Sequence, residues 1–500
     1  MVLYFAAMLT IGFIYSKRSN SSTKQYFAGG RGVGPWLTAL SAEASDMSGW
    51  LLMGLPGVAY FTGAADPMWT AIGLALGTYL NWKLVARRLR RYSVVAGDAI
   101  TIPDFFSRRF KDDKNILMCI SAIIILVFFI PYTASGFKAI GTLFSSLFGT
   151  DYHIAMIVGA IVIVGYTVMG GFMAVSTTDL IQSVVMSISL VVIVFYGIHM
   201  AGGWSQVVDN ATSLAGYLSM TQMHDRSTAA ATPYGLLTTV STLAWGLGYF
   251  GMPHILLRFM AIEEEKKLVL SRRIATVWVL ISMCVAILIG IIGYGASVAG
   301  SIPMFTTSSQ SETVIIQFAH LLGQNGFLLS LIAGVVLAGI LACTMSTADS
   351  QLLTAASGVS QNLLQDFLKI KMSTAASMNA ARLTVMGIAI VAVFLAWNPD
   401  SSVFTIVSFA WAGFGASFGP LVLFALFWRR TNKQGALAGM LTGGVMVFVW
   451  KYLVRPLGGN FNIYELLPAF VLSCLAIVIV SLLTKEPSKE IYDEFDSVGK

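Results

Sequence analysis

Charged residues are scarce in this chain of 500 residues. Asp, Glu, Lys and Arg together make up 11% of it, whereas soluble domains contain about 25%. Hydrophobic residues account for 56%, and the mean hydropathy is +0.76. Apolar runs long enough to cross about 30 Å of hydrocarbon recur along the whole length. The composition excludes a soluble globular protein and predicts a polytopic, all-α membrane protein.

Cysteine and long polar stretches are also scarce. Cys119, Cys284, Cys343 and Cys474 lie within apolar runs and form no C-x-x-C pair, so we expect buried free thiols rather than a disulfide or metal framework. The net charge of +7 does not indicate nucleic-acid binding, because the basic residues lie in short loops. No polar stretch is long enough for a catalytic domain, and we expect no cofactor.

Two short motifs resemble those of enzymes. Gly246–Gly251 fits G-x-G-x-x-G and Gly415–Gly419 fits G-x-S-x-G. The first requires a strand before it and a helix after it, and the second a strand–turn–helix elbow. Both lie inside apolar runs, so we interpret both as coincidental and predict that the chain is not an enzyme.

The apolar runs predict thirteen membrane spans. They are 1–16, 37–62, 66–86, 116–147, 153–173, 176–200, 233–259, 274–299, 326–354, 380–397, 402–428, 435–456 and 464–484. Of the 31 Lys and Arg residues, 27 lie on the side of the loops that follow odd-numbered spans, as the positive-inside rule requires of cytoplasmic loops. This pattern predicts an N-terminus outside and a C-terminus in the cytoplasm. The outer loop 201–232 could hold a short helix, and the tail 485–500 is expected to fray.

Two of the spans are poorly built as helices. The second contains "SAEASDMSGWLLMGLPG" (41–57), and the seventh has Gly246, Gly248, Gly251 and Pro253 within eight residues. Glycine and proline weaken a helix interior, so both spans should unwind. Paired broken spans in inverted halves indicate the central site of a transporter. Alternatively, the glycines only let helices pack closely.

This interpretation divides the chain into six parts. They are 1–36 (first span and cytoplasmic loop), 37–200 (first inverted repeat), 201–232 (extracellular loop), 233–428 (second inverted repeat), 429–484 (peripheral spans) and 485–500 (cytoplasmic tail).

Carboxylates inside spans are costly and are functional hypotheses by default. Asp46 lies at the predicted break of the second span, Asp179 near the start of the sixth, and Asp349 in the ninth beside Ser346 and Thr347. Carboxylates, hydroxyls and unwound carbonyls suit Na⁺ or proton transfer. Two alternatives stay open: Asp179 could cap its helix, and Glu43 could face a cytoplasmic vestibule with little effect.

Aromatic residues accompany both breaks. Trp245 and Tyr249 are one turn apart in the seventh span, and Tyr132 lies in "PYTASG" of the fourth. Such rings either pack in the core or close over an apolar or cationic ligand.

Several stretches together resemble the solute:sodium symporter family, in particular its proline-transporting branch. They are "GGRGVGPWLTALSAEASDMSGWLLMGLPG", "PYTASG", "GGFMAVSTTDLIQ", "WGLGYFGMPHILLRFM", "MSTADSQLL", "FAWAGFGASFGPLVLFALFW" and "GALAGM", and they cover essentially the whole chain. The resemblance implies the leucine-transporter-type fold, with a 5+5 inverted repeat in spans 2–6 and 7–11 and peripheral helices around it.

The resemblance also implies roles for particular residues. A Na⁺ site would use the carbonyls of Ala44, Met47 and Cys343 and the hydroxyls of Ser346 and Thr347. A proline pocket would use Ser48, Gly49, Tyr132, Trp245, Tyr249 and Pro253. Asp46 matches the essential acidic residue of the second span, Asp179 matches that of the sixth, on the inner sodium path, and Arg31 matches a coupling arginine. Glu43 and Asp349 depart from the family pattern; Asp349 could add to a second cation site or tune sodium release.

The function implied is Na⁺-coupled import of L-proline across the cell membrane by alternating access. The partners expected are L-proline, Na⁺ and the lipid bilayer. One alternative is a Na⁺ or H⁺ symporter for another small zwitterion or a betaine, and a different class would be a channel or an intramembrane enzyme. The sequence does not indicate an oligomeric state.

Overall fold

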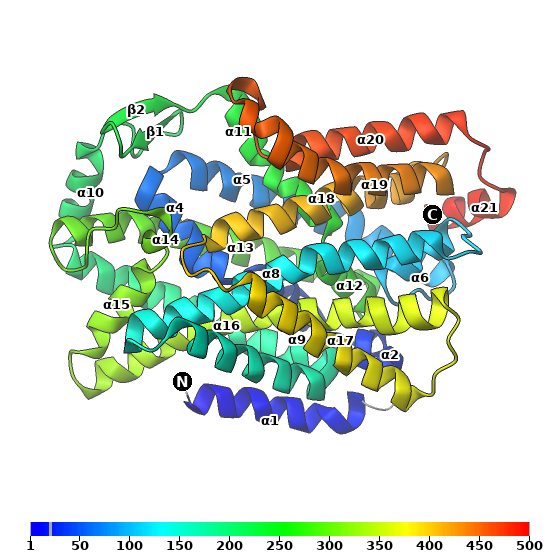
Figure 1. Cartoon of the computed structure of the whole chain (residues 1–500), viewed down its shortest axis with the longest axis horizontal. Coiled ribbons are helices and arrows are strands. Elements are labelled where there is room, and N and C mark those ends of the chain that lie inside the picture. Colours follow the sequence, from blue (N-terminus) through cyan, green and yellow to red (C-terminus); the bar gives the residue numbers. More distant parts are fainter. Residues whose placement is uncertain (1, 20–22, 500) are drawn as a thin grey trace.

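Long helices running side by side make up most of the molecule (Figure 1). The computed structural model describes residues 2–19 and 23–499. The helices and strands are α1 Val2–Ser19, α2 Thr23–Ala28, α3 Pro35–Asp46, α4 Leu55–Thr62, α5 Ala65–Leu80, α6 Arg87–Val95, α7 Ile102–Arg109, α8 Ile116–Phe148, α9 Tyr152–Met200, α10 Trp204–Ser213, β1 Gln222–Asp225, β2 Ala230–Pro233, α11 Leu236–Leu243, α12 Pro253–Ala261, α13 Leu268–Val298, α14 Ser308–Ser311, α15 Val314–Gly323, α16 Phe327–Ser357, α17 Thr374–Leu395, α18 Val403–Phe427, α19 Lys433–Val449, α20 Leu466–Leu483 and α21 Lys489–Val498.

Tighter or wider helical turns extend or interrupt these helices. The π-helical segments are η2 Trp50–Gly54, η3 Asn81–Ala86, η6 Gly358–Phe367 and η7 Trp450–Val454, and the 3-10 segments are η1 Gly29–Arg31, η4 Ala244–Gly251, η5 Glu265–Lys267, η8 Arg455–Leu457 and η9 Gly459–Phe461. Two of them, η2 and η4, lie inside the spans predicted to be broken.

Eight helical stretches in the described part of the chain are long and apolar enough to cross a membrane. They cover nine predicted spans, because α9 contains two. The predicted spans 1–16, 37–62, 66–86 and 233–259 fall on shorter or interrupted helices. The all-α membrane fold is confirmed, whereas the count of thirteen crossings and the inverted repeat stay predictions.

The break between predicted spans five and six lies at a different place from the one expected. The two spans form α9, a single element of 49 residues that bends at Gly171, where φ is 62° and ψ is −171°. The sequence boundary of 173–176 is therefore wrong by a few residues. Gly171 adopts a backbone conformation that residues with a Cβ rarely reach, so the two arms of α9 meet without a separate loop.

Both predicted breaks are present. In the second span, α3 ends at Asp46, and Met47 leaves the helical region with ψ 72° before the π turn η2. In the seventh span, α11 passes into the 3-10 segment η4. Met252 then becomes extended, with φ −78° and ψ 108°, before Pro253 starts α12. Each span therefore consists of two half-helices around a non-helical centre.

Close packing, the alternative explanation for the glycines, is also correct. A Cβ on Gly246 would lie 2.1 Å from the carbonyl oxygen of Gly73 in α5, and one on Gly248 would lie 1.9 Å from the indole nitrogen of Trp411 in α18. Overlap at these distances is not tolerated. The glycines of the seventh span thus loosen its helix and admit α5 and α18 against its backbone.

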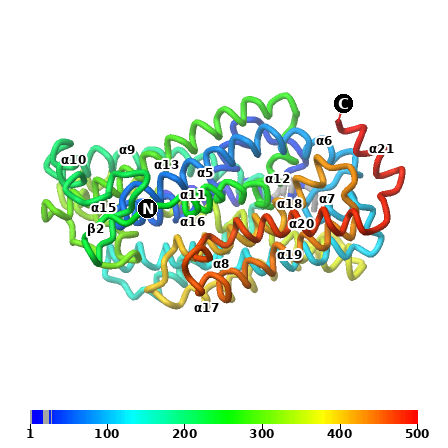
Figure 2. The backbone as a smooth tube through the Cα atoms, turned by 90° about the horizontal axis from the view of Figure 1, so that it is seen from above, coloured from blue at the N-terminus to red at the C-terminus, as the bar shows by residue number. Residues whose placement is uncertain are grey.

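The connecting segments gather at the two ends of the helices. In Figures 1 and 2, α10, α15 and β2 lie at one end, while α6 and α21 lie at the other. Helix α10 fulfils the expectation of a short helix in the loop 201–232. The antiparallel β1–β2 hairpin, which pairs Met223 with Thr232, and the helices α14 and α15 were not predicted.

Two further expectations are wrong. The tail does not fray: residues 489–498 form α21, whose Ile491, Phe495 and Val498 are buried. The four cysteines are free thiols as expected, but Cys284 is exposed on α13, while Cys119 and Cys474 are only partly covered; Cys343 is buried. Apolar side chains on the outside of a membrane protein meet lipid rather than protein, so an apolar run does not by itself imply burial.

Candidate functional site

Oxygen atoms from two helices meet at the break of the second span. The hydroxyl of Ser346, in the middle of α16, donates a hydrogen bond of 2.7 Å to the carbonyl of Ala44 in α3, and lies 3.2 Å from the carbonyl of Cys343. The hydroxyl of Thr347 donates to the same Cys343 carbonyl at 3.1 Å. Met47 is fully buried at the end of α3. Of the predicted sodium ligands, Ser346 and Ala44 therefore join α16 to α3, Cys343 and Thr347 lie within one turn of Ser346, and Met47 follows at the end of α3.

Asp46 links the two broken spans. The hydroxyl of Tyr249, from η4, donates to its Oδ2 at 2.7 Å. The backbone carbonyl of Asp46 accepts from the hydroxyl of Tyr132 at 3.3 Å and from the indole of Trp50 at 3.2 Å. The other carboxylate oxygen, Oδ1, is buried and has no hydrogen-bond partner within the described residues. Since an unpartnered buried carboxylate oxygen is costly, this atom suits a cation.

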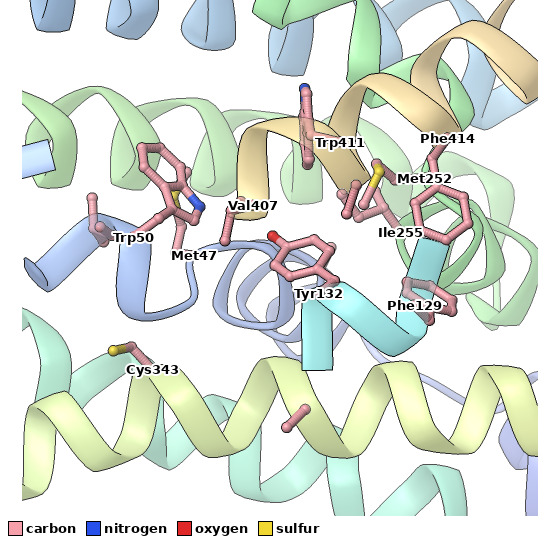
Figure 3. Packing of buried hydrophobic residues seen from close by; sticks show 14 of the residues in the cluster. Met47, Trp50, Phe129, Tyr132, Met252, Ile255, Cys343, Val407, Trp411 and Phe414 are labelled. Atoms are coloured by element: carbon pink, nitrogen blue, oxygen red, sulfur yellow. The ribbon is translucent and has the colours of Figure 1, made fainter. Parts of the chain in front are cut away.

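Several residues predicted to bind the amino acid lie around the same break. Figure 3 shows Tyr132 with its hydroxyl pointing toward the segment that carries Met47 and Trp50, and with Val407 and Trp411 of α18 nearby. The residue after Met47, Ser48, is buried, and its backbone N–H donates to the carbonyl of Asp46 at 2.9 Å. These groups bring polar backbone atoms and aromatic rings to a common centre.

Gly49 and Pro253 mark two backbone positions beside this centre. A Cβ on Gly49 would lie 3.1 Å from the Cβ of Ala139 and 3.6 Å from the hydroxyl of Thr344, so a side chain there would press against α8. Pro253 is buried at the first turn of α12, where its fixed φ suits a helix start.

Trp245 lies within a cluster of aromatic rings. Its ring stacks on Tyr464 at a centroid distance of 5.0 Å and contacts Phe404 at 5.3 Å, with Trp50 and Trp411 each at 6.3 Å. The indole of Trp411 also donates to the Trp245 carbonyl at 2.8 Å. Both interpretations of this residue, packing and ligand contact, are compatible with its place at the break.

Asp179 does not cap a helix. It is buried in the second arm of α9, where its Oδ2 accepts from Ser41 at 2.6 Å and from the guanidinium of Arg258 at 2.9 Å. Arg258 comes from α12, is itself only 2% exposed, and also donates to Ser41 and to Ser350, each at 2.7 Å. One buried ion pair thus joins α3, α9, α12 and α16.

Asp349 lies next to this ion pair. Its Oδ2 accepts from the hydroxyl of Tyr166 at 3.0 Å, and its Oδ1 lies 3.3 Å from the hydroxyl of Ser350, the same hydroxyl that accepts from Arg258. Two carboxylates therefore lie around one guanidinium, and Oδ1 of Asp179 is buried with no partner among the described atoms. If both carboxylates ionise, the cluster carries one negative charge that a further cation or a proton would balance.

Glu43 does not face an open vestibule. It is 1% exposed, and its Oε1 accepts from the indole of Trp82 at 3.0 Å. The expectation of a carboxylate facing an open vestibule is therefore wrong, because the helix packs this face against the third span.

Arg31 joins three segments beside α6, where its guanidinium contacts Ser93. It forms an ion pair with Asp98 at 2.9 Å, and its guanidinium donates to the carbonyls of Ala99 and Met260, each at 2.8 Å. Met260 lies in α12, two residues after Arg258, so Arg31 anchors the end of the half-helix that carries the buried ion pair.

Sequence reasoning did not single out Arg258, Tyr166 or Ser41. Arg258 stands within the apolar run "HILLRFM", and a charged residue inside a span is a functional signal. Counting it only among the basic residues of a cytoplasmic end hid that signal. Tyr166 and Ser41 carry no comparable mark, since only the fold brings them beside carboxylates that are far away in the chain.

Comparison with known proteins points to one family. The sodium:solute symporter family model matches residues 26–443. Sodium/proline symporters of Staphylococcus aureus strains RF122 and USA300 are 40% identical over 504 aligned residues, covering 100% of this chain and 94% of theirs.

Two solved structures share the fold. A Na⁺-coupled sialic acid symporter in a substrate-bound, outward-open state superimposes with a TM-score of 0.79 at 19% identity, over 97% of both chains. Mhp1, a nucleobase-cation-symport-1 family transporter in a closed conformation, gives a TM-score of 0.53 at 13% identity, over 94% of this chain and 98% of its own. The match over most of its length, with the fold these structures share, shows that the chain belongs to the sodium:solute symporter family of secondary transporters.

Proposed function

We propose that the protein imports L-proline together with Na⁺ by alternating access. The observation that carries this proposal is the 2.7 Å contact between the Ser346 hydroxyl and the Ala44 carbonyl. This contact joins a hydroxyl of α16 to the last turn of α3, just before the second span unwinds at Met47. The proposed substrate, proline, is inferred from the sodium/proline symporters that this chain resembles at 40% identity.

The cation would lie between α3 and α16. The carbonyls of Ala44, Met47 and Cys343 and the hydroxyls of Ser346 and Thr347 would hold Na⁺, which would replace the hydrogen bonds that these groups now make with one another. Oxygen ligands of this kind are those that hard cations prefer. Na⁺ held there would fix the break of the second span, and Asp46, one position before Met47, would supply nearby negative charge.

The amino acid would bind beside the ion. Backbone N–H groups around Ser48 and Gly49 would receive its carboxylate, as half-helix N-termini do in related folds, and the Ser48 N–H would give up its present bond to the Asp46 carbonyl. Tyr132 and Tyr249 would close the site around Asp46, and Trp245 and Pro253 would line it. Because both ligands depend on the same break, Na⁺ and proline would each tighten the binding of the other by the same factor.

The buried cluster around Asp179 and Asp349 would lie on the inner part of the sodium path. With both carboxylates ionised, the surplus negative charge would attract a cation leaving the first site, and Arg258 would hold the four helices together while the cation passes. Arg31 would couple this movement to the loop that follows the first span.

We also propose the arrangement in the cell. Residues 37–200 and 233–428 would form the two inverted halves, with the remaining spans peripheral. The protein would lie in the cell membrane with its N-terminus outside and its C-terminus in the cytoplasm, since the basic residues gather at the end of the molecule that carries α6 and α21.

The test is uptake of labelled L-proline into proteoliposomes under an inward Na⁺ gradient, with a K⁺ gradient as control. We expect uptake that needs Na⁺ and that excess L-proline, but not D-proline, suppresses. If a betaine suppressed the uptake better than L-proline does, the substrate would be a betaine rather than L-proline. Equal uptake under both gradients would refute sodium coupling.

A further inference from the structure

A groove on the outside of the helix bundle has the features of a lipid site. It has a volume of about 650 Å³ and lies between the start of α3, the second arm of α9 and the first half of α13. Figure 2 shows α13 along an outer edge of the molecule. The groove shares no residue with the site around Asp46 and Asp179.

The walls of the groove are apolar and exposed. Val184 and Ile188 of α9 and Val277 and Ile281 of α13 are 52%, 47%, 57% and 57% exposed. The groove also contains the hydroxyl of Ser187, which is not free, because the indole of Trp278 donates to it at 3.0 Å. The walls therefore offer hydrocarbon contacts rather than hydrogen bonds, as an acyl chain requires.

The length of the groove matches one leaflet. It runs along α13 from Arg273 to Val285, and twelve residues of α-helix rise about 18 Å. This is a little over half of the roughly 30 Å hydrocarbon core. Trp36, at the start of α3, is 58% exposed at the same end as Arg273, and tryptophan prefers the level of the lipid headgroups.

Positive charge is in excess at the end of the groove that carries Arg273. The acidic residues of the preceding loop are engaged elsewhere: Glu263 and Glu264 pair with Lys267, and Glu265 pairs with two arginines of α6. Arg273 is exposed at the rim, and no ion pair to it is found in the described part of the chain. Its guanidinium is therefore available to an anionic group at the mouth of the groove.

We propose that this groove binds an anionic phospholipid of the leaflet on the α6 side, the predicted cytoplasmic leaflet. One acyl chain lies between α9 and α13, and the phosphate pairs with Arg273 beside Trp36. Basic residues at the rim of a groove between membrane helices select anionic headgroups by this chemistry. The proposal depends on the membrane fold and on the position of the basic end, and it does not require proline as the substrate.

The experiment is a titration of the purified full-length protein with phosphatidylglycerol and, in parallel, phosphatidylcholine of the same acyl chains, read by native mass spectrometry. We expect phosphatidylglycerol to bind more tightly to the unmodified protein. Arg273→Gln should raise its apparent dissociation constant about fivefold, the effect of one cation near an anionic surface. Lys371→Gln, which removes a cation from the exposed segment before α17, is the matched control and should change nothing.

A second variant separates the groove from the charge. Val184→Trp fills the groove without altering any charge, and it should weaken both lipids while leaving L-proline uptake measurable. Equal binding of the two lipids to the unmodified protein, or an unchanged constant in Arg273→Gln, would overturn the proposal. Self-association of the protein that Val184→Trp abolishes, without any effect on lipid binding, would assign the groove to a second copy of the chain.

Discussion

Hydroxyl groups on α16 show how much a single residue can report about function. Ser346 and Thr347 were predicted as cation ligands because they match the family pattern at a helix that faces a predicted break. The structure places the Ser346 hydroxyl on the Ala44 carbonyl, 302 positions away in the chain. Their role in sodium binding stays a proposal, whereas the contact of Ser346 with α3 is a structural fact.

Removing the Ser346 hydroxyl should weaken sodium binding selectively. In Ser346→Ala we expect the Na⁺ concentration for half-maximal uptake to rise about tenfold, the effect of losing a charge-assisted contact of about 1.5 kcal/mol. Thr354→Ala is the control, because the Thr354 hydroxyl donates only to the Ser350 carbonyl of its own helix. An equal rise in both variants would contradict the assignment.

Asp46 should matter more than any other carboxylate at the first break. Replacing it by Asn keeps the size and the acceptor for Tyr249 but removes the negative charge. We therefore expect Asp46→Asn to raise the half-maximal Na⁺ concentration by more than about tenfold, the equivalent of 1.4 kcal/mol, measured as initial uptake over a Na⁺ series. Glu43→Gln, which retains the contact with Trp82, should change it by less than about threefold. Unchanged Na⁺ dependence in Asp46→Asn would exclude the role proposed for this carboxylate.

At the scale of elements, the sequence predicted where helices break but not what they pack against. Gly246, Gly251 and Pro253 were sufficient to place the discontinuity of the seventh span, since helix propensity is a local property. The ion pair of Asp179 with Arg258 was not predicted, because it depends on how α9 and α12 cross. The bend in α9 was placed slightly too late, as the apolar pattern continues through it.

Because η4 lies so close to α5, a side chain at their contact should lower the stability of the protein. A Cβ at Gly246 meets the backbone of Gly73, which cannot move aside. We expect Gly246→Ala to destabilise the purified protein by about 1–3 kcal/mol, the cost of overpacking, seen as a lower thermal midpoint. Gly387→Ala in α17 has nothing within 4 Å of the new Cβ and should be neutral or slightly stabilising.

The buried ion pair between Arg258 and Asp179 should also contribute to stability. Arg258→Gln leaves Asp179 buried without its counter-charge, which costs about 3–5 kcal/mol. The thermal midpoint should fall accordingly. Adding Asp179→Asn should recover part of the loss, because it removes the carboxylate that pairs directly with Arg258 and leaves Asp349 as the one acidic side chain of the cluster. Equal midpoints for the single and double variants would show that Arg258 acts through its contacts with Ser41 and Ser350 instead.

Over the whole molecule, the basic residues and the apolar runs were enough to predict a helical membrane protein whose loops gather at two ends. Helix α1 lies along one side of the bundle and α21 at one end of it (Figure 1). Neither apolar runs nor basic clusters indicate that α21 docks, because a short charged tail has the same composition whether it is free or docked. Docking depends on surfaces built from distant segments: Phe495 lies against the guanidinium groups of Arg88 and Arg109, at 4.8 Å and 5.3 Å.

Charge also holds α21 in place. Lys111, in the loop before α8, pairs with Glu490 at 3.0 Å and with Glu494. Although burial by itself lowers the pKa of Lys111, its hydrogen bonds with Glu494 and Glu490 raise that pKa above the usual value. The ammonium group therefore stays charged at neutral pH, and the pairing persists as long as the two carboxylates remain ionised.

The docking of α21 can be tested by proteolysis. Burying a phenylalanine side chain contributes about 1.5–3 kcal/mol, so Phe495→Ala should increase the undocked population, and with it the rate of tryptic cleavage after Lys489, by about tenfold or more. Asp493→Ala, a change on the exposed face of the same helix, serves as the control. A tail that is cut equally fast in the unmodified protein and in Phe495→Ala would show that α21 is not held by this contact.

Helix α21 also has a consequence for biosynthesis. It is the last described helix to leave the ribosome, yet it binds Lys111 through two glutamates and contacts Arg429 through Asp496 and Tyr492. These partners must already be inserted and assembled before the tail can reach them. Docking of α21 is therefore a late step that occurs only on a completed bundle. Chains that end before Lys489 would therefore lack the cover that α21 gives to Lys111, Arg88 and Arg429.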